Sequence, residues 1–148
     1  MQFPKDEQAW LKGFDQFFSN TAAENLGITL KSISDDQIEL LMPITDKVRQ
    51  PYGLLHGGAS MLLAETAASV HATWGVDLNV VQPVGIEISG SHVRSAREGH
   101  VRAMGKVIRR THSLIFHQVD ITLVESGELL STARVTNYYR RVKKEPLR

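Results

Sequence analysis

The segment of residues 57–74 (GGASMLLAETAASVHATW) constrains the fold most, because it predicts a helix without a polar face. It is rich in Ala, Leu and Met and contains no Pro, a composition that favours helix. At about 100° per residue, Met61 and Leu62 lie on one side, and Leu63 and Ala67 lie on the other. A helix that is apolar all round is buried all round. The rest of the chain must therefore form a layer that surrounds this helix.

The residues after this helix supply such a layer, since their apolar side chains alternate with period two, as in strands. Turns are expected at 98–99, 110–112 and 126–127, and the short connections predict an antiparallel meander. Four groups of apolar residues each share one strand face: Val84, Ile86 and Ile88; Val101, Ala103, Gly105 and Val107; Ile115, Val119, Ile121 and Leu123; Leu129, Ala133 and Val135.

The first third of the chain predicts a flanking helix and a hairpin. Trp10 and Phe14 recur at helical spacing, which favours a helix over about 6–20. Strand patterns follow at 28–34 and 37–43, and a loop is expected over 45–55. We therefore predict an α+β fold in which a curved antiparallel sheet wraps one central helix. The 148 residues suit one domain, 1–148, with an N-terminal helical segment (1–26) and a basic tail (140–148).

Composition excludes several classes of site. Without cysteine the chain has no disulfides, zinc fingers or thiol nucleophiles, and its histidines lack H-x-x-x-H spacing, so neither a metal nor a redox cofactor is expected. No signal peptide or membrane span is recognisable, so we expect a cytoplasmic protein without a membrane partner. Residues 91–113 carry six basic groups against Glu98 alone, which suits a polyanion. They lack interleaved aromatic residues, so nucleic acid is not expected.

Glu65 breaks the apolar pattern of the central helix. Its face holds Met61, Leu62, Ala68 and Ala72, with Ser69 at i+4 as its polar neighbour. A helical Glu is usually exposed to solvent, but a carboxylate on an apolar helix face is costly unless it is paired. Glu65 is therefore a candidate general base or nucleophile.

The second candidate element is His56-Gly57-Gly58, at the start of the same helix. Glycines at a helix N-terminus leave backbone N–H groups open to a ligand, and the helix dipole favours negative charge there. Such an end can hold an oxyanion, although a pair of glycines more often serves a turn.

Helix geometry separates these two elements. Gly57 and Glu65 are eight residues apart, or about 12 Å along one helix axis, so they cannot both touch one small acyl group. If two copies of the helix pack antiparallel across a two-fold axis, the glycine end of one meets the glutamate of the other. The sequence thus predicts a homodimer with shared active sites.

The segments Gln50–Ser69 (QPYGLLHGGASMLLAETAAS) and Ser91–Gly99 (SHVRSAREG) resemble the hotdog-fold acyl-CoA thioesterases. Within that family the likeness is to the branch of 1,4-dihydroxy-2-naphthoyl-CoA hydrolase, from menaquinone biosynthesis, and 4-hydroxybenzoyl-CoA thioesterase. It extends from about residue 27 to residue 138. The resemblance implies hydrolysis of an aromatic acyl-CoA to the free acid and CoA.

The resemblance also implies roles for single residues. Glu65 would attack the thioester or activate water, and the Gly57 N–H would bind the oxyanion. His56 and Gln50 would lie around the thioester carbonyl, with Ser69 orienting the water or the carboxylate. The family implies dimers of dimers and a basic surface for the CoA phosphates, here His92, Arg94, Arg109, Arg110, Thr111, His112 and Ser113.

Two other functions stay open at this point. A hotdog-type hydratase or dehydratase also combines His with an acid, but it needs the acid placed at the α and β carbons. A non-catalytic acyl-CoA binding module would be expected to carry an output domain, for which 148 residues leave no room.

Overall fold

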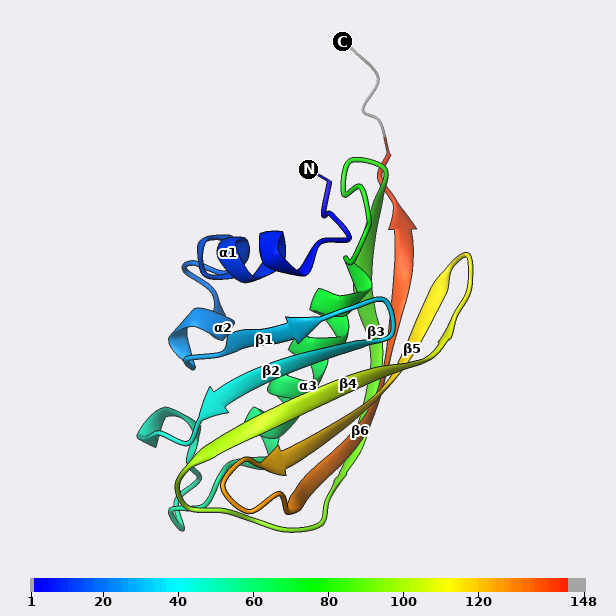
Figure 1. Cartoon of the computed structure of the whole chain (residues 1–148). Coiled ribbons are helices and arrows are strands. Elements are labelled where there is room, and N and C mark those ends of the chain that lie inside the picture. Colours follow the sequence, from blue (N-terminus) through cyan, green and yellow to red (C-terminus); the bar gives the residue numbers. More distant parts are fainter. Residues whose placement is uncertain (1, 144–148) are drawn as a thin grey trace.

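The computed structural model describes residues 2–143, in which a six-stranded antiparallel sheet curves around one long helix (Figure 1). The helices are α1 (Glu7–Phe17), α2 (Ala22–Asn25) and α3 (Gly57–Ala72), with a short 3-10 turn, η1 (Asp46–Val48). The strands are β1 (Thr29–Ile33), β2 (Gln37–Pro43), β3 (Val81–His92), β4 (His100–Arg110), β5 (Leu114–Leu123) and β6 (Leu129–Arg141). The α+β prediction is confirmed.

Alternation along the strands creates the concave face that holds α3. Ile38, Leu40 and Met42 of β2 are fully buried, as are Val119 and Ile121 of β5. Their side chains point to one side of the sheet because successive strand residues point to opposite faces. They pack with the buried face of α3 into one core, so the period-two pattern carried the right information.

The expectation that α3 is buried all round is only half met within one chain. Leu63, Ala64, Ala67 and Ala68 are fully buried. The opposite side of the helix keeps a partly exposed strip, and the strip includes the carboxylate singled out above. Its members are Met61, Leu62, Glu65, Thr66 and Ser69.

The predicted meander is right for β4, β5 and β6 and wrong for β3. The strand order is β1-β2-β4-β5-β6-β3, so β3 pairs with β6 and lies at an edge, and the chain crosses over from β3 to β4. Alternation gives the faces of a strand but not its neighbours, which is why the sequence missed this. The β3 edge is long, and Ile86 on it is 58% exposed.

Two predicted boundaries are also corrected. Asp6 caps α1 by accepting from the N–H groups of Gln8 and Ala9, and the helix ends at Phe17, short of residue 20. The basic tail does not start at Arg140, because Arg140 and Arg141 still belong to β6 and pair with β3. Residues 144–148 of the predicted tail lie outside the described residues.

Two buried histidines join the C-terminal end of α3 to the sheet. His71 of α3 and His117 of β5 are fully buried, and Nδ1 of His71 lies 2.7 Å from Nε2 of His117. The other ring nitrogen of His71 lies 2.8 Å from the carbonyl oxygen of Ser34. Burial lowers the pKa of His117 from 6.5 to about 3, helped by the charges of His71 and Arg110. Burial likewise lowers the pKa of His71. Both rings are therefore neutral in the folded protein at neutral pH.

This pair predicts loss of stability in mild acid. The unfolded chain binds protons at these histidines below about pH 6.5 while the folded chain does not, so the free energy of unfolding falls with pH in that range. Each histidine contributes a slope approaching about 1.4 kcal/mol per pH unit. Urea denaturation followed by tryptophan fluorescence from pH 7 to 5 measures it. His117→Gln should reduce the slope and the exposed control His112→Gln should not; equal slopes for His117→Gln and wild type would contradict the account.

Candidate active site

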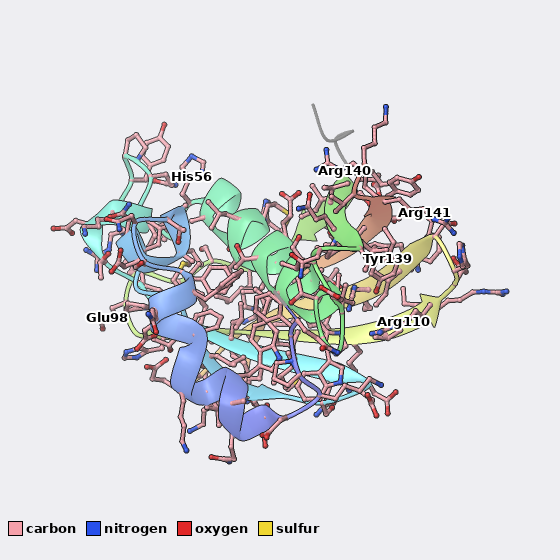
Figure 2. All side chains as sticks on the ribbon, turned by 90° about the horizontal axis from the view of Figure 1, so that it is seen from above. His56, Glu98, Arg110, Tyr139, Arg140 and Arg141 are labelled. Atoms are coloured by element: carbon pink, nitrogen blue, oxygen red, sulfur yellow. The ribbon has the colours of Figure 1, made fainter. Side chains whose placement is uncertain are left out.

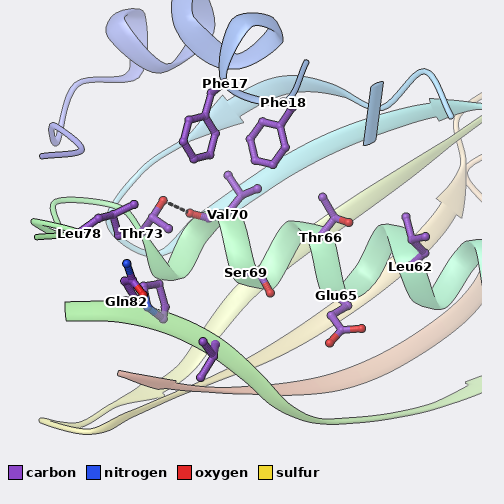
Figure 3. A pocket seen from close by; sticks show the side chains of 12 residues that line it. Phe17, Phe18, Leu62, Glu65, Thr66, Ser69, Val70, Thr73, Leu78 and Gln82 are labelled. Carbon is purple, nitrogen blue, oxygen red and sulfur yellow. Dashed lines mark hydrogen bonds between the residues drawn. The ribbon is translucent and has the colours of Figure 1, made fainter. Parts of the chain in front are cut away.

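A cavity of about 530 Å³ lies between α1, α3 and the start of β3. Phe17 and Phe18 point toward α3 from the end of α1 (Figure 3). Pro83 and Val84 of β3 also line the cavity. Polar groups come from α3, where Glu65 and Ser69 line the cavity one helical turn apart. The cavity is thus mostly apolar with a carboxylate in its wall, which is the composition expected of a site for a small organic group.

Gly85 of β3 makes room for the Glu65 carboxylate. A Cβ at residue 85 would lie 2.8 Å from Oε1 of Glu65, closer than real Cβ contacts come. The strand is irregular here, with a register shift between Gly85 and Glu87. Only a residue without a side chain lets this strand pass so close to the carboxylate.

Ser69 is held from the sheet by a buried amide. Its Oγ donates to Oδ1 of Asn137 on β6, at 3.2 Å, and Asn137 is fully buried. The Nδ2 group of Asn137 has no hydrogen-bond partner among the described residues. Asn137 pairs in register with Gly85, so Glu65, Ser69 and Asn137 surround the same point of β3.

The helix begins at Gly57, as the sequence indicated, but the N–H of Gly58 is already bonded within the chain. His56 is the N-cap of α3, and its Nδ1 accepts from the N–H of Gly58 at 2.8 Å. Because Nδ1 is the acceptor, the proton of the neutral ring lies on Nε2, which makes Nε2 a donor. A Cβ at Gly57 would lie 2.5 Å from Nε2 of His92, so the glycine also makes room for a histidine.

One chain does not bring the five predicted catalytic residues together. Glu65 and Ser69 line the cavity, whereas His56 and Gly57 lie two helical turns away at the start of α3. Gln50 lies before α3, in the turn where its side-chain oxygen accepts from the N–H of Tyr52. Their catalytic roles stay predictions.

The seven residues predicted to bind CoA also separate into two groups. His92 packs against Gly57, and Arg94 forms a 2.8 Å salt bridge with Glu128 near that end. Arg109 and Arg110 end β4 and residues 111–113 form the turn to β5, near the C-terminal end of α3, where the charge of Arg110 acts on His71. Figure 2 shows Arg110 far from His56, and its charge acts on Tyr139 of β6. Their role in CoA binding stays a prediction.

Within residues 2–143, no group of His, Asp and Glu side chains is arranged to hold a metal ion. None of the helices in that part of the chain is long and apolar enough to cross a membrane.

Comparisons with known proteins decide the family. A family model described as "Thioesterase superfamily" matches residues 52–130, from the turn before α3 to the start of β6. The chain belongs to this family. It is 41% identical over 111 residues to 1,4-dihydroxy-2-naphthoyl-CoA hydrolase of Escherichia coli strain K12, covering 75% of the chain and 80% of the relative. A proofreading thioesterase of Cronobacter sakazakii is 44% identical over 84 residues, 57% of the chain and 61% of the relative.

Solved structures agree with this family. A thioesterase from Haemophilus influenzae superposes with a TM-score of 0.84 at 32% identity, over 90% of the chain and 92% of that structure. A mutant thioesterase from Pseudomonas aeruginosa gives a TM-score of 0.85 at 28% identity, over 89% and 94% of the two chains. The hotdog fold is therefore confirmed, and the protein is a thioester hydrolase.

The structure adds residues to the site that the sequence analysis did not name. Gly85 and Asn137 lie beside Glu65 and Ser69, but both come from strands whose pairing the sequence did not reveal. Phe17 and Phe18 were assigned only to a flanking helix, and both line the cavity. An isolated Gly in a strand pattern was the one available signal, since it often marks a close approach.

Gly85→Ala should impair activity with little loss of stability. Its methyl group would displace the end of a flexible side chain, that of Glu65, and not the backbone. We expect kcat/KM for thioester hydrolysis to fall at least about tenfold, because small misplacements of a reacting group are costly. Gly13→Ala on α1 is the matched control, since nothing lies within 4 Å of a Cβ there. Equal kcat/KM in the two variants would contradict this assignment.

Proposed function

We propose that this protein hydrolyses an aromatic acyl-CoA, of the 1,4-dihydroxy-2-naphthoyl or hydroxybenzoyl type, in active sites shared by two subunits. The observation that carries the proposal is the position of Glu65 in the wall of an apolar cavity, with the open helix start at Gly57 two turns away. A thioester needs both a carboxylate that delivers water and donors for its oxygen.

The cavity supports an aromatic acyl group. Phe17 and Phe18 lie with ring centroids 4.8 Å apart in an edge arrangement and contribute ring surface to the wall. Aromatic pairs of this kind add stabilisation beyond the area that they bury. The Escherichia coli relative bears the name of an aromatic acyl-CoA hydrolase, which supports the same substrate here and a place in menaquinone biosynthesis. We propose that the protein is located in the cytoplasm.

Two features support a dimer in which the sites are shared. Among residues 2–143, no strand pairs with the outer edge of β3, and β3 lies beside the partly exposed strip of α3. Antiparallel pairing of β3 with a second copy would extend the sheet and lay the two α3 helices side by side. The partner's Gly57 then comes to Glu65, and the strip becomes buried. We propose a further pairing of such dimers, as the family resemblance implies.

The same dimer would bring the two groups of predicted CoA-binding residues to one cleft. The partner's His92 and the partner's Arg94 accompany the glycine end to the cleft, while Arg109–Ser113 lie near the C-terminal end of the α3 that carries Glu65. Both groups then flank the cleft that holds the thioester. Basic side chains and the Thr and Ser hydroxyls of the turn are suitable partners for the CoA phosphates.

In the proposed reaction a water oxygen bonds to the thioester carbon and the C–S bond breaks. As a general base, Glu65 takes a proton from that water and passes it to the departing CoA sulfur. As a nucleophile, Glu65 instead bonds to the carbon and expels the CoA thiolate. Water then hydrolyses the resulting anhydride, which frees the acid and supplies the proton for the thiolate. The Gly57 N–H and Nε2–H of His56 stabilise negative charge on the carbonyl oxygen in the transition state. Removal of one oxyanion donor costs about 100- to 1,000-fold in kcat in other hydrolases.

The test is thiol release from benzoyl-CoA, 4-hydroxybenzoyl-CoA, naphthoyl-CoA and a medium-chain acyl-CoA. Wild type should hydrolyse the aromatic thioesters with the highest kcat/KM. Glu65→Gln should lose at least about 100-fold in kcat, because an amide neither accepts the proton nor attacks. Glu98→Gln, which changes an exposed carboxylate in the β3–β4 connection, is the control and should behave as wild type.

Four results would contradict the proposal in whole or in part. Unchanged thiol release in Glu65→Gln would remove Glu65 from the site. Hydration of an enoyl-CoA without thiol release would favour a hydratase, and binding of every thioester without release would favour a binding module. A preference for the medium-chain thioester would contradict the aromatic substrate alone.

A further inference from the structure

The buried amide of Asn137 has hydrogen-bonding capacity that the fold does not use. The residue is fully buried in β6, between its neighbours in β3 and β5. Its Oδ1 accepts from Ser69, but its Nδ2 has no acceptor among residues 2–143. A buried donor without a partner is costly, and most such groups in proteins are bonded to protein or ordered water. An apolar residue would avoid that cost, so we expect the amide to have a function.

The location of the amide indicates that function. Gly85 has Oε1 of Glu65 2.8 Å from its Cβ position, and Oδ1 of Asn137 3.8 Å from it. The carboxylate and the amide therefore lie beside the same point of β3, and Ser69 reaches that amide from α3. Ser69 and Glu65 also line the cavity, so the three groups border the place proposed for the acyl group.

The directions of the hydrogen bonds suit one water molecule. The Ser69 hydroxyl donates a hydrogen bond to Oδ1 of Asn137, so the lone pairs of Ser69 Oγ are free to accept. Glu65 as a carboxylate is also an acceptor, while Asn137 Nδ2 is a donor. A water donates two hydrogen bonds and accepts two, so it can bind all three groups and keep one lone pair.

We infer that Asn137 is a positioning residue, which with Ser69 holds the hydrolytic water against Glu65 with its remaining lone pair directed at the thioester carbon. This inference rests on the proposed role of Glu65 and specifies how the water is held. The oxygen of that water bonds to the acyl carbon, its proton goes to Glu65, and the CoA thiolate leaves and is protonated. Asn137 touches neither the acyl group nor CoA.

The test uses the full-length protein and whichever thioester wild type hydrolyses fastest. Asn137→Ala should lower kcat about 10- to 100-fold with KM within about threefold, because water placement and not substrate binding is lost. Ser69→Ala should have a similar effect on kcat. The kcat of the double variant should be no lower than that of the less active single variant, since both residues act on one water. Thr136→Val, a buried polar residue next along β6, is the control.

Two readouts separate a positioning role from a merely structural one. With methanol added, Asn137→Ala should give more methyl ester relative to acid than wild type, because the water is no longer held in preference. Asn137→Asp keeps the size of the side chain but places a second carboxylate beside Glu65, so the ascending limb of its kcat–pH profile should move to higher pH.

The inference is overturned if both Asn137 variants keep kcat within about twofold of wild type. It is also overturned if kcat falls only in proportion to the folded fraction, with the methanol partition and the pH profile unchanged. Glu65→Gln measured alongside separates this failure from that of the proposed function. If Glu65→Gln is inactive and the Asn137 variants keep the kcat of wild type, only this inference fails. If Glu65→Gln is active, the proposed function fails as well.

Discussion

The rigidity of one helix is the constraint on which the rest of the structure depends. α3 runs without interruption from Gly57 to Ala72, which fixes the Gly57 N–H about 12 Å along the helix axis from residue 65. No side-chain movement in one subunit closes that gap. Residues 2–143 also include a partly exposed strip on the same helix and, beside it, the long edge of β3, which pairs only with β6. A second subunit placed against both would explain all three features with one contact.

The sheet contributes more to the site than a wall. Gly85 lets β3 approach the Glu65 carboxylate, and Asn137 on β6 accepts a hydrogen bond from Ser69. These groups come from neighbouring strands in register, so the sheet fixes their relative positions as firmly as the helix fixes Glu65 and Ser69. The aromatic part of the cavity wall comes instead from the end of α1, through Phe17 and Phe18. The carboxylate and the aromatic wall are thus built on different elements.

Sequence patterns predicted what depends on periodicity and missed what depends on pairing. The helix, its start at His56-Gly57-Gly58 and the alternating strands follow from local rules, and they are confirmed. The place of β3 beside β6 does not, because alternation says nothing about neighbours. The missed site residues share that cause: Gly85 and Asn137 become interpretable only when β3 and β6 are side by side. The apolar pattern of α3 also predicted burial on all sides, whereas one side of the helix is partly exposed in a single chain.

Subunit complementation tests the shared site most directly. Glu65→Gln and His56→Asn each remove one half of the site, and Asn retains the capping ability of residue 56. Both homodimers should be nearly inactive. When the two are refolded together in equal amounts, half of the dimers are mixed and each has one intact site, so thiol release should recover to about a quarter of wild type. Activity that stays at the mean of the two variants would show that each site lies within one chain.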